Sequence, residues 1–179
     1  TFHPVGHGAF YTERFYDGSG KCIFTAVFDC GCFEAAKPGC NAQFYEKQIA
    51  TVIQKVFTKG DTIDVLFISH FHTDHINGVK FLLKYCDVKR IYIPILTPRV
   101  ILEAFLFNYI QTGSINNVGN KLIEKFASGQ IPNVTQIRTH RINKNGTFHN
   151  VPFPLIQHKH FQSYIHLNLN YYLFRQSHQ

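Results

Sequence analysis

The chain has 179 residues and a mass of 20.7 kDa, with 45% hydrophobic and 16% charged residues, a net charge of +7 and a pI near 9.2. This is the composition of a globular domain, and it excludes a disordered or low-complexity chain. No segment approaches the roughly 20 apolar residues of a membrane span, so the sequence predicts a single domain over residues 1–179, without a membrane partner and cytoplasmic by default.

The first half of the chain alternates between strand and helix patterns. Residues 8–16 and 22–28, rich in aromatic and β-branched side chains, flank Asp17-Gly18-Ser19-Gly20, and this pattern predicts a β-hairpin. Apolar residues at helical spacing then predict a helix over residues 43–57. The short apolar run over residues 64–68 is typical of a strand covered on both faces.

The alternation continues after that strand. The sequence predicts one helix from Ile76 onward, a strand over residues 88–95, and helices over residues 99–109 and 118–126, the last closed by Gly129. Three further strands are predicted over residues 135–142, 147–153 and 164–174. The order favours an α/β fold in which loops at the carboxyl ends of the strands carry the function.

Five cysteines, an odd number in a chain of this size, favour a reducing compartment. Four of them, Cys22, Cys30, Cys32 and Cys40, lie close enough in sequence to suggest a structural zinc. The usual spacer of two to four residues within each ligand pair is missing, and buried free thiols are the alternative interpretation.

Charge is distributed unevenly along the chain. All 11 acidic residues lie at or before Glu124, whereas six basic residues and six histidines follow it. A segment without carboxylates favours polyanions such as nucleic acid or phosphorylated ligands, although a basic surface without a ligand is the alternative.

The segment with the clearest chemistry is Ser69-His70-Phe71-His72-Thr73-Asp74-His75, between a predicted strand and a predicted helix. Three histidines and one carboxylate within six residues are poor core residues, because imidazole and carboxylate groups are costly to bury without partners. Imidazole and carboxylate are ligands for zinc, and also for iron or manganese. The spacing therefore predicts a metal site, with surface histidines as the alternative.

This His-x-His-x-Asp-His pattern, with Gly78 three residues later, resembles the signature of the metallo-β-lactamase superfamily. The resemblance implies an αββα sandwich and a hydrolase with up to two metal ions, His70 and His72 binding one, Asp74 and His75 the other. Asp74 would also act catalytically by orienting the attacking water. The segment Val27-Phe28-Asp29-Cys30-Gly31 is similar to the family's strand-end Asp-x-Gly, which implies that Asp29 supports the metal ligands.

The opening segment, Val5-Gly6-His7-Gly8-Ala9-Phe10, most resembles the competence-protein branch of the superfamily, which is linked to nucleic-acid or phosphodiester substrates. The resemblance is good over residues 1–95, the metal-binding half. It is weak over residues 96–179, expected to form a helical insert and part of a second sheet.

Two ligands of the family pattern are open. No aspartate follows Asp87, so the bridging carboxylate is missing, and neither Glu103 nor Glu124 lies at a predicted strand end. The third histidine of the first metal site is either His140 or His160. These gaps, with a start that lacks methionine, lead us to expect an incomplete chain with only part of the second half. A divergent member with one metal or none is the alternative.

The sequence therefore predicts a metal-dependent hydrolase that acts on a phosphodiester or nucleic acid. An ester, thioester or lactam hydrolase is the enzymatic alternative. A non-catalytic nucleic-acid-binding module that has lost a working metal pair is the alternative from another class.

Overall fold

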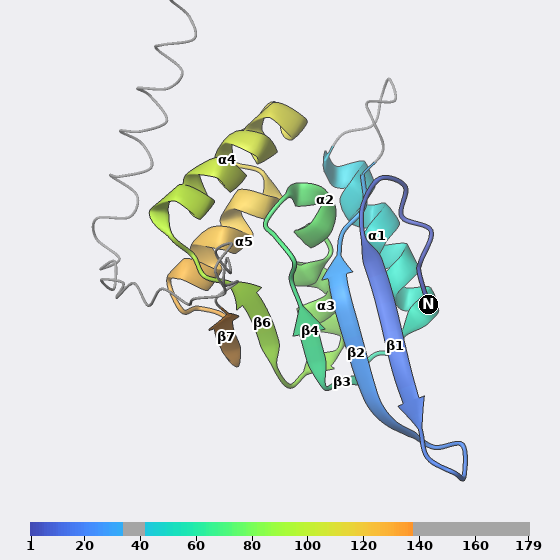
Figure 1. Ribbon diagram of the computed structural model, residues 1–179. Helices are drawn as coiled ribbons and strands as arrows, with labels where there is room; N and C mark the ends of the chain where they lie inside the picture. Colours follow the sequence, from blue (N-terminus) through green and yellow to red (C-terminus); the bar gives the residue numbers. More distant parts are fainter. Residues whose placement is uncertain (34–41, 138–179) are drawn as a thin grey trace, which may run out of the picture.

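The computed structural model describes residues 1–33 and 42–137, and its centre is a mixed five-stranded sheet in the order β1-β2-β4-β6-β7 (Figure 1). The antiparallel hairpin consists of β1 (Phe10–Tyr16) and β2 (Cys22–Cys30). Parallel to β2 follow β4 (Val65–Phe67), β6 (Ile91–Pro94) and β7 (Val134–Ile137). The predicted α/β class is confirmed, and so is the hairpin.

The hairpin turn is stabilised by the side chain of Asp17. Its Oδ1 accepts hydrogen bonds from the backbone N–H of Ser19 at 2.9 Å and of Lys21 at 3.0 Å. Gly20 has a positive φ of 84°, a conformation that glycine adopts without steric cost. The aspartate and glycine residues that predict the turn are therefore the ones that stabilise it in the structure.

Helices connect the parallel strands and bury their apolar sides against the sheet. These are α1 (Ala42–Val56), α3 (Val79–Tyr85), α4 (Pro98–Thr112) and α5 (Val118–Ala127), and Figure 1 shows α1 and α3 next to each other behind the strands. Sheet and helices share one core, whose fully buried members include Val27, Ile49, Ile53, Leu66, Val79, Leu82, Ile91, Ile101 and Ile123. None of the described helices has the length and apolar run needed to cross a membrane.

Two predicted elements are divided in the structure. The helix expected from Ile76 is instead a short α2 (Thr73–Ile76) and a separate α3, because the backbone groups at the break bond to the hairpin side: Gly78 N donates to Cys30 O at 2.8 Å, and Asp74 O accepts from Ala9 N at 3.2 Å. The side chain of Asn77 adds to this contact. Its Oδ1 accepts from Cys32 N at 3.0 Å, and its Nδ2 donates to Cys32 O at 2.8 Å, so the buried amide is satisfied.

The strand predicted over residues 88–95 is also wrong at its start. β5 (Asp87–Val88) pairs with β3 (Thr62–Ile63) in a separate two-stranded parallel sheet, and the main sheet resumes only at Ile91.

A row of aromatic rings crosses the sheet on the face opposite the helices. Tyr11, Phe28, Phe67 and Tyr92 are neighbours in register, with ring centroids 5.6, 4.9 and 5.3 Å apart in that order. Their neighbours in sequence point into the core, since successive side chains of a strand alternate between faces. The strands predicted over residues 147–153 and 164–174 lie outside the described residues, so the second layer of the sandwich stays a prediction.

The structural zinc suggested by the cysteines is not supported. Cys22 and Cys30 lie at opposite ends of the nine-residue β2, and roughly 3.3 Å per residue separates them too widely to share an ion. Burial raises the pKa of the Cys30 thiol well above its usual value, which keeps it neutral. Cys40 lies outside the described residues, Cys30 and Cys86 are buried free thiols, and the buried Cys32 donates to Tyr45 O at 3.1 Å.

Candidate metal centre

The candidate ligands lie on the segment of residues 69–75, hereafter the metal loop. It follows β4 and includes the first three residues of α2. The loop lies at the carboxyl end of β4, next to the end of β2, because these two strands are parallel neighbours. This is the edge at which parallel α/β sheets collect functional side chains. The position matches the expectation from the sequence.

The end of β2 lies so close to the metal loop that only glycine fits there. A Cβ on Gly31 would lie 2.2 Å from the carbonyl oxygen of Asp74 and 2.6 Å from the backbone nitrogen of His75. Backbone hydrogen bonds fix the same contact, with Ala9 N donating to Asp74 O at 3.2 Å and Gly78 N donating to Cys30 O at 2.8 Å. The hairpin and the loop are therefore one packed unit.

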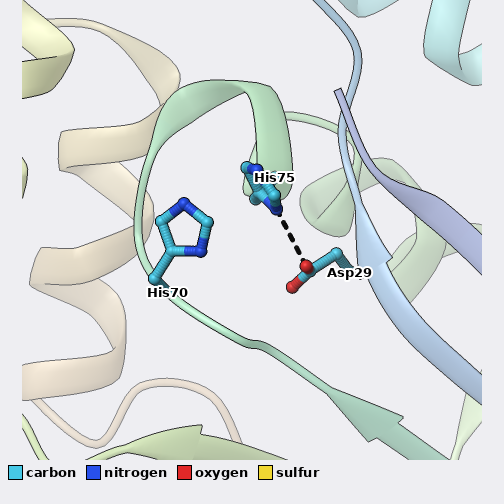
Figure 2. Close-up of side chains that lie close together, drawn as sticks. All are labelled: Asp29, His70 and His75. Carbon is cyan, nitrogen blue, oxygen red and sulfur yellow. Dashed lines mark hydrogen bonds and ion pairs between the residues drawn. The ribbon is translucent and has the colours of Figure 1, made fainter. Parts of the chain in front are cut away.

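Asp29 connects β2 to the metal loop through its carboxylate, which is only 6% exposed. Its Oδ1 accepts from Ser69 N at 2.7 Å, and its Oδ2 accepts from Ser69 Oγ at 2.6 Å. The same Oδ2 lies 2.8 Å from Nδ1 of His75, the contact drawn in Figure 2. A carboxylate only accepts, so Nδ1 of His75 carries a proton and Nε2 is the nitrogen left to bind a metal.

The same reasoning extends to His70 through Ser69. The Ser69 hydroxyl gives its one proton to Asp29, so its oxygen accepts from Nδ1 of His70, which lies 2.9 Å away. Nε2 of His70 is then also free of a proton. Asp29 thus sets the tautomers of two histidines, one directly and one through a serine.

Three imidazoles lie against one another in the centre. The ring of His70 has its centroid 3.9 Å from that of His75 and 4.4 Å from that of His72. Burial, with the neighbouring imidazoles His75 and His72, lowers the pKa of His70 to about 4. His70 is therefore neutral at pH 7, the state in which imidazole binds metals.

The pKa values of the other two histidines are shifted in opposite directions. Burial chiefly lowers the pKa of His72, whose ring stacks on Phe107 with centroids 3.6 Å apart and planes 11° from parallel. Burial would also lower the pKa of His75, but the hydrogen bond and charge of Asp29, with the charge of Asp74, outweigh it and raise this pKa.

The carboxylate of Asp74 is the group whose surroundings best suit a bound cation. Its Oδ2 lies 3.6 Å from Nε2 of His75, whereas its buried Oδ1 has no hydrogen-bond partner among the described residues. An unpaired buried carboxylate oxygen is costly, and a divalent cation would satisfy it. Neutral imidazole nitrogens beside such an oxygen are a donor set that suits zinc, iron or manganese.

Within the described residues, Asp29, His70 and His75 form a group of potential ligand atoms, with one atom of each within 4.8 Å of the others (Figure 2). Both oxygens of Asp29 already accept hydrogen bonds, so we assign this residue to orienting the imidazoles. His72 touches the group through His70, and Asp74 touches it through His75. The four predicted ligands thus form a continuous cluster, and their role as ligands stays a prediction.

Two ligand positions of the family pattern remain: the third histidine and the bridging carboxylate. His140 and His160 lie outside the described residues. Glu103 is exposed on α4 and pairs with Arg99, its Oε1 accepting from Nε at 2.7 Å, and Glu124 lies on α5. Among the described residues, neither glutamate side chain makes a hydrogen bond or an ion pair with the metal loop. Ser69 and Phe107 are contacts that the sequence did not single out.

Comparison with known families adds one finding. The model of the metallo-beta-lactamase superfamily matches residues 15–147, more than half of the chain. The match includes Asp29, the metal loop and α4. No curated protein and no solved structure matches the chain. The chain therefore belongs to the metallo-beta-lactamase superfamily.

Proposed function

We propose that this protein is a metal-dependent hydrolase whose ion is held by His70, His72, Asp74 and His75. The observation that supports this most is the buried Oδ1 of Asp74, which has no hydrogen-bond partner among the described residues, in a loop where the ring of His70 contacts the rings of both His72 and His75. Membership of a superfamily composed mostly of hydrolases supports the reaction class. Zinc is the first candidate ion, with up to two bound, and iron or manganese are alternatives.

The candidate residues would have two roles, holding the ion and orienting the attacking water. A divalent ion, when bound, lowers the pKa of water and polarises the scissile group. Nε2 of His70 and of His75 would hold it, since both Nδ1 positions are occupied by hydrogen bonds to Ser69 and Asp29. Asp74 would orient the attacking water through its carboxylate, whose Oδ1 has no partner in the part of the chain that the structure describes.

The proposed substrate class is a phosphodiester, including nucleic acid. Two features of the sequence support it: the absence of acidic residues after Glu124, and the resemblance of residues 5–10 to the competence-protein branch. A basic segment attracts polyanions and raises their local concentration. An ester, thioester or lactam is the alternative substrate class.

Metal binding is the first test. Zinc content and affinity should be measured for the purified chain and for His72→Ala and His75→Ala, with His3→Ala as a control. His3 is a histidine outside the centre, and its Nε2 hydrogen-bonds to Oγ1 of Thr12 at 2.9 Å. We expect the control to bind as the parent does and both loop variants to lose the ion. Equal zinc binding by all four proteins would overturn the proposal.

Substrate preference is the second test. Hydrolysis of a bis-aryl phosphodiester should be compared with that of an aryl ester, each with added zinc, iron or manganese. Phosphodiester turnover that His72→Ala abolishes supports the proposed class, whereas ester turnover alone selects the alternative. Nucleic-acid binding that is unchanged by chelation, without hydrolysis of either compound, would identify a binding module instead.

A further inference from the structure

A buried asparagine of α4 makes hydrogen bonds to the backbone of the metal loop. Asn108 has no exposed surface, and its Oδ1 accepts from Thr73 N at 2.7 Å while its Nδ2 donates to Phe71 O at 3.0 Å. Thr73 and Phe71 are the two neighbours of His72 in the chain. One side chain therefore holds the backbone on both sides of a single candidate ligand.

The orientation of this amide is fixed by its own partners. Nδ2 of Asn108 also donates to Oδ1 of Asn120 at 3.0 Å, and Nδ2 of Asn120 donates to Ile115 O at 2.9 Å. Asn120 N in turn donates to Oδ1 of Asn117, the N-cap of α5, at 2.8 Å. Both side-chain amides, those of Asn108 and Asn120, have partners for their oxygen and their nitrogen, so the network favours one arrangement of α4, α5 and the loop.

The residue before Asn108 contacts the same ligand from another direction. Phe107 stacks on the ring of His72, with centroids 3.6 Å apart and planes 11° from parallel. A stacked ring restricts the rotation of an imidazole without using either of its nitrogens. Two consecutive residues of α4 thus act on His72, one through its backbone and the other through its ring.

We propose that Phe107 and Asn108 are positioning residues that hold His72 in place for the metal, so that α4 is part of the metal centre. This inference rests on the proposed function, because it assumes that His72 is a ligand. A ligand held before the ion arrives loses less conformational freedom on binding, and supporting contacts of this kind typically change metal affinity by about 10–100-fold.

The experiment compares conservative and disruptive variants on the full chain. Phe107→Leu removes the aromatic ring, and Phe107→Tyr keeps it. Asn108→Ala removes all three hydrogen bonds. Asn108→Asp keeps an acceptor for Thr73 N but cannot donate to Phe71 O. Ile110→Ala is the matched control on the same helix, because Ile110 is 79% exposed.

Three quantities are measured for each protein: zinc affinity by competition with a chelating dye, melting temperature, and the ring-proton chemical shifts of His72 without metal. We expect Phe107→Leu to lose the upfield ring-current shift of His72 and to bind zinc about tenfold more weakly. Phe107→Tyr should retain both properties, and both Asn108 variants should bind about 10–100-fold more weakly. Ile110→Ala should match the parent.

The outcomes separate the two proposals. A parent chain that binds no zinc overturns the proposed function, and with it the role of α4. A parent that binds zinc, with Phe107→Leu and the Asn108 variants binding equally well, overturns the positioning role alone. A fall in melting temperature without a change in affinity has the same meaning, because it shows a purely structural contribution. If the Asn108 variants fail to fold, the two Phe107 variants decide.

Discussion

The metal loop is held from two sides that work differently. On the sheet side, Asp29 bonds to Ser69 and to His75, setting which nitrogens of His70 and His75 carry protons. On the helix side, Asn108 bonds only to the backbone of the loop, and Phe107 stacks on the His72 ring. The sheet side therefore controls protonation of the centre, whereas the helix side controls its geometry.

The largest effect should follow from disturbing the contact between hairpin and loop. In Gly31→Ala the new Cβ would lie 2.2 Å from the carbonyl oxygen of Asp74, and backbone at such a distance has to move. We expect a loss of about 3 kcal/mol in the free energy of unfolding, together with loss of metal. Chemical denaturation and a zinc titration measure the two effects.

Gly18→Ala is the matched control for that experiment, since a Cβ on Gly18 meets nothing within 4 Å. It should leave stability and zinc affinity close to those of the parent. If Gly31→Ala behaves like this control, the close packing of hairpin and loop is wrong.

The sheet side is tested next by Asp29→Asn. Asp29 has a positive φ of 52°, and asparagine tolerates this conformation better than other residues with a side chain, so the backbone should be preserved. The amide can no longer accept from both Ser69 and Nδ1 of His75, so the tautomer of His75 is released. We expect zinc affinity to fall about 10–100-fold, measured by competition titration.

Two results would contradict that interpretation. Unchanged affinity in a folded Asp29→Asn protein would show that Asp29 does not orient the ligands. Complete loss of the ion, equal to that in His75→Ala, would indicate that Asp29 is itself a ligand, in agreement with its closeness to His70 and His75.

The pH dependence of metal binding should report on His75 rather than on His70. The pKa of His75 is raised, so its proton competes with the metal at a higher pH than that of an ordinary imidazole, whereas His70, with a pKa of about 4, is already neutral. Zinc affinity should therefore fall as pH drops below the pKa of His75, by up to about tenfold per pH unit. Titrations at pH 6, 7 and 8 test this, and a flat profile would contradict it.

The same titrations sharpen the comparison between the two sides. In Asp29→Asn the decline should move to lower pH, because the contacts that raise the pKa of His75 are weakened. In Phe107→Leu the profile should keep its shape and shift only in overall affinity, since Phe107 touches His72.

The smallest effect is expected for Glu103→Gln. Glu103 is on α4, but its exposed carboxylate pairs with Arg99 rather than with the metal loop. An exposed ion pair of this type contributes little to stability. Zinc content and melting temperature should match the parent, and loss of zinc would show that Glu103 supplies the missing carboxylate.

Much of the fold could be predicted because its periodic patterns are strong. The hairpin, α1, α4 and α5 begin and end within a few residues of the predicted positions. The break between α2 and α3 was missed because the apolar spacing continues through it. What interrupts the helix is the hydrogen bonding of Gly78 N to Cys30 O and of Ala9 N to Asp74 O, contacts distant in sequence.

In the candidate site, too, some residues could be predicted from the sequence and others could not. The ligand types and their position after a buried strand are local in sequence, so His70, His72, Asp74 and His75 could be proposed from it. Phe107 and Asn108 could not, because each acts over more than 30 residues of sequence. The available signal was Asn108 itself, a polar residue within the apolar run Leu106-Phe107-Asn108-Tyr109-Ile110.

X-ray absorption spectroscopy of the zinc-loaded chain tests the central claim most directly. We expect nitrogen and oxygen neighbours at about 2.0–2.1 Å with an imidazole signature, and fewer imidazoles in His72→Ala and in His75→Ala. Sulfur neighbours at about 2.3 Å, or an imidazole signature that neither substitution changes, would contradict it.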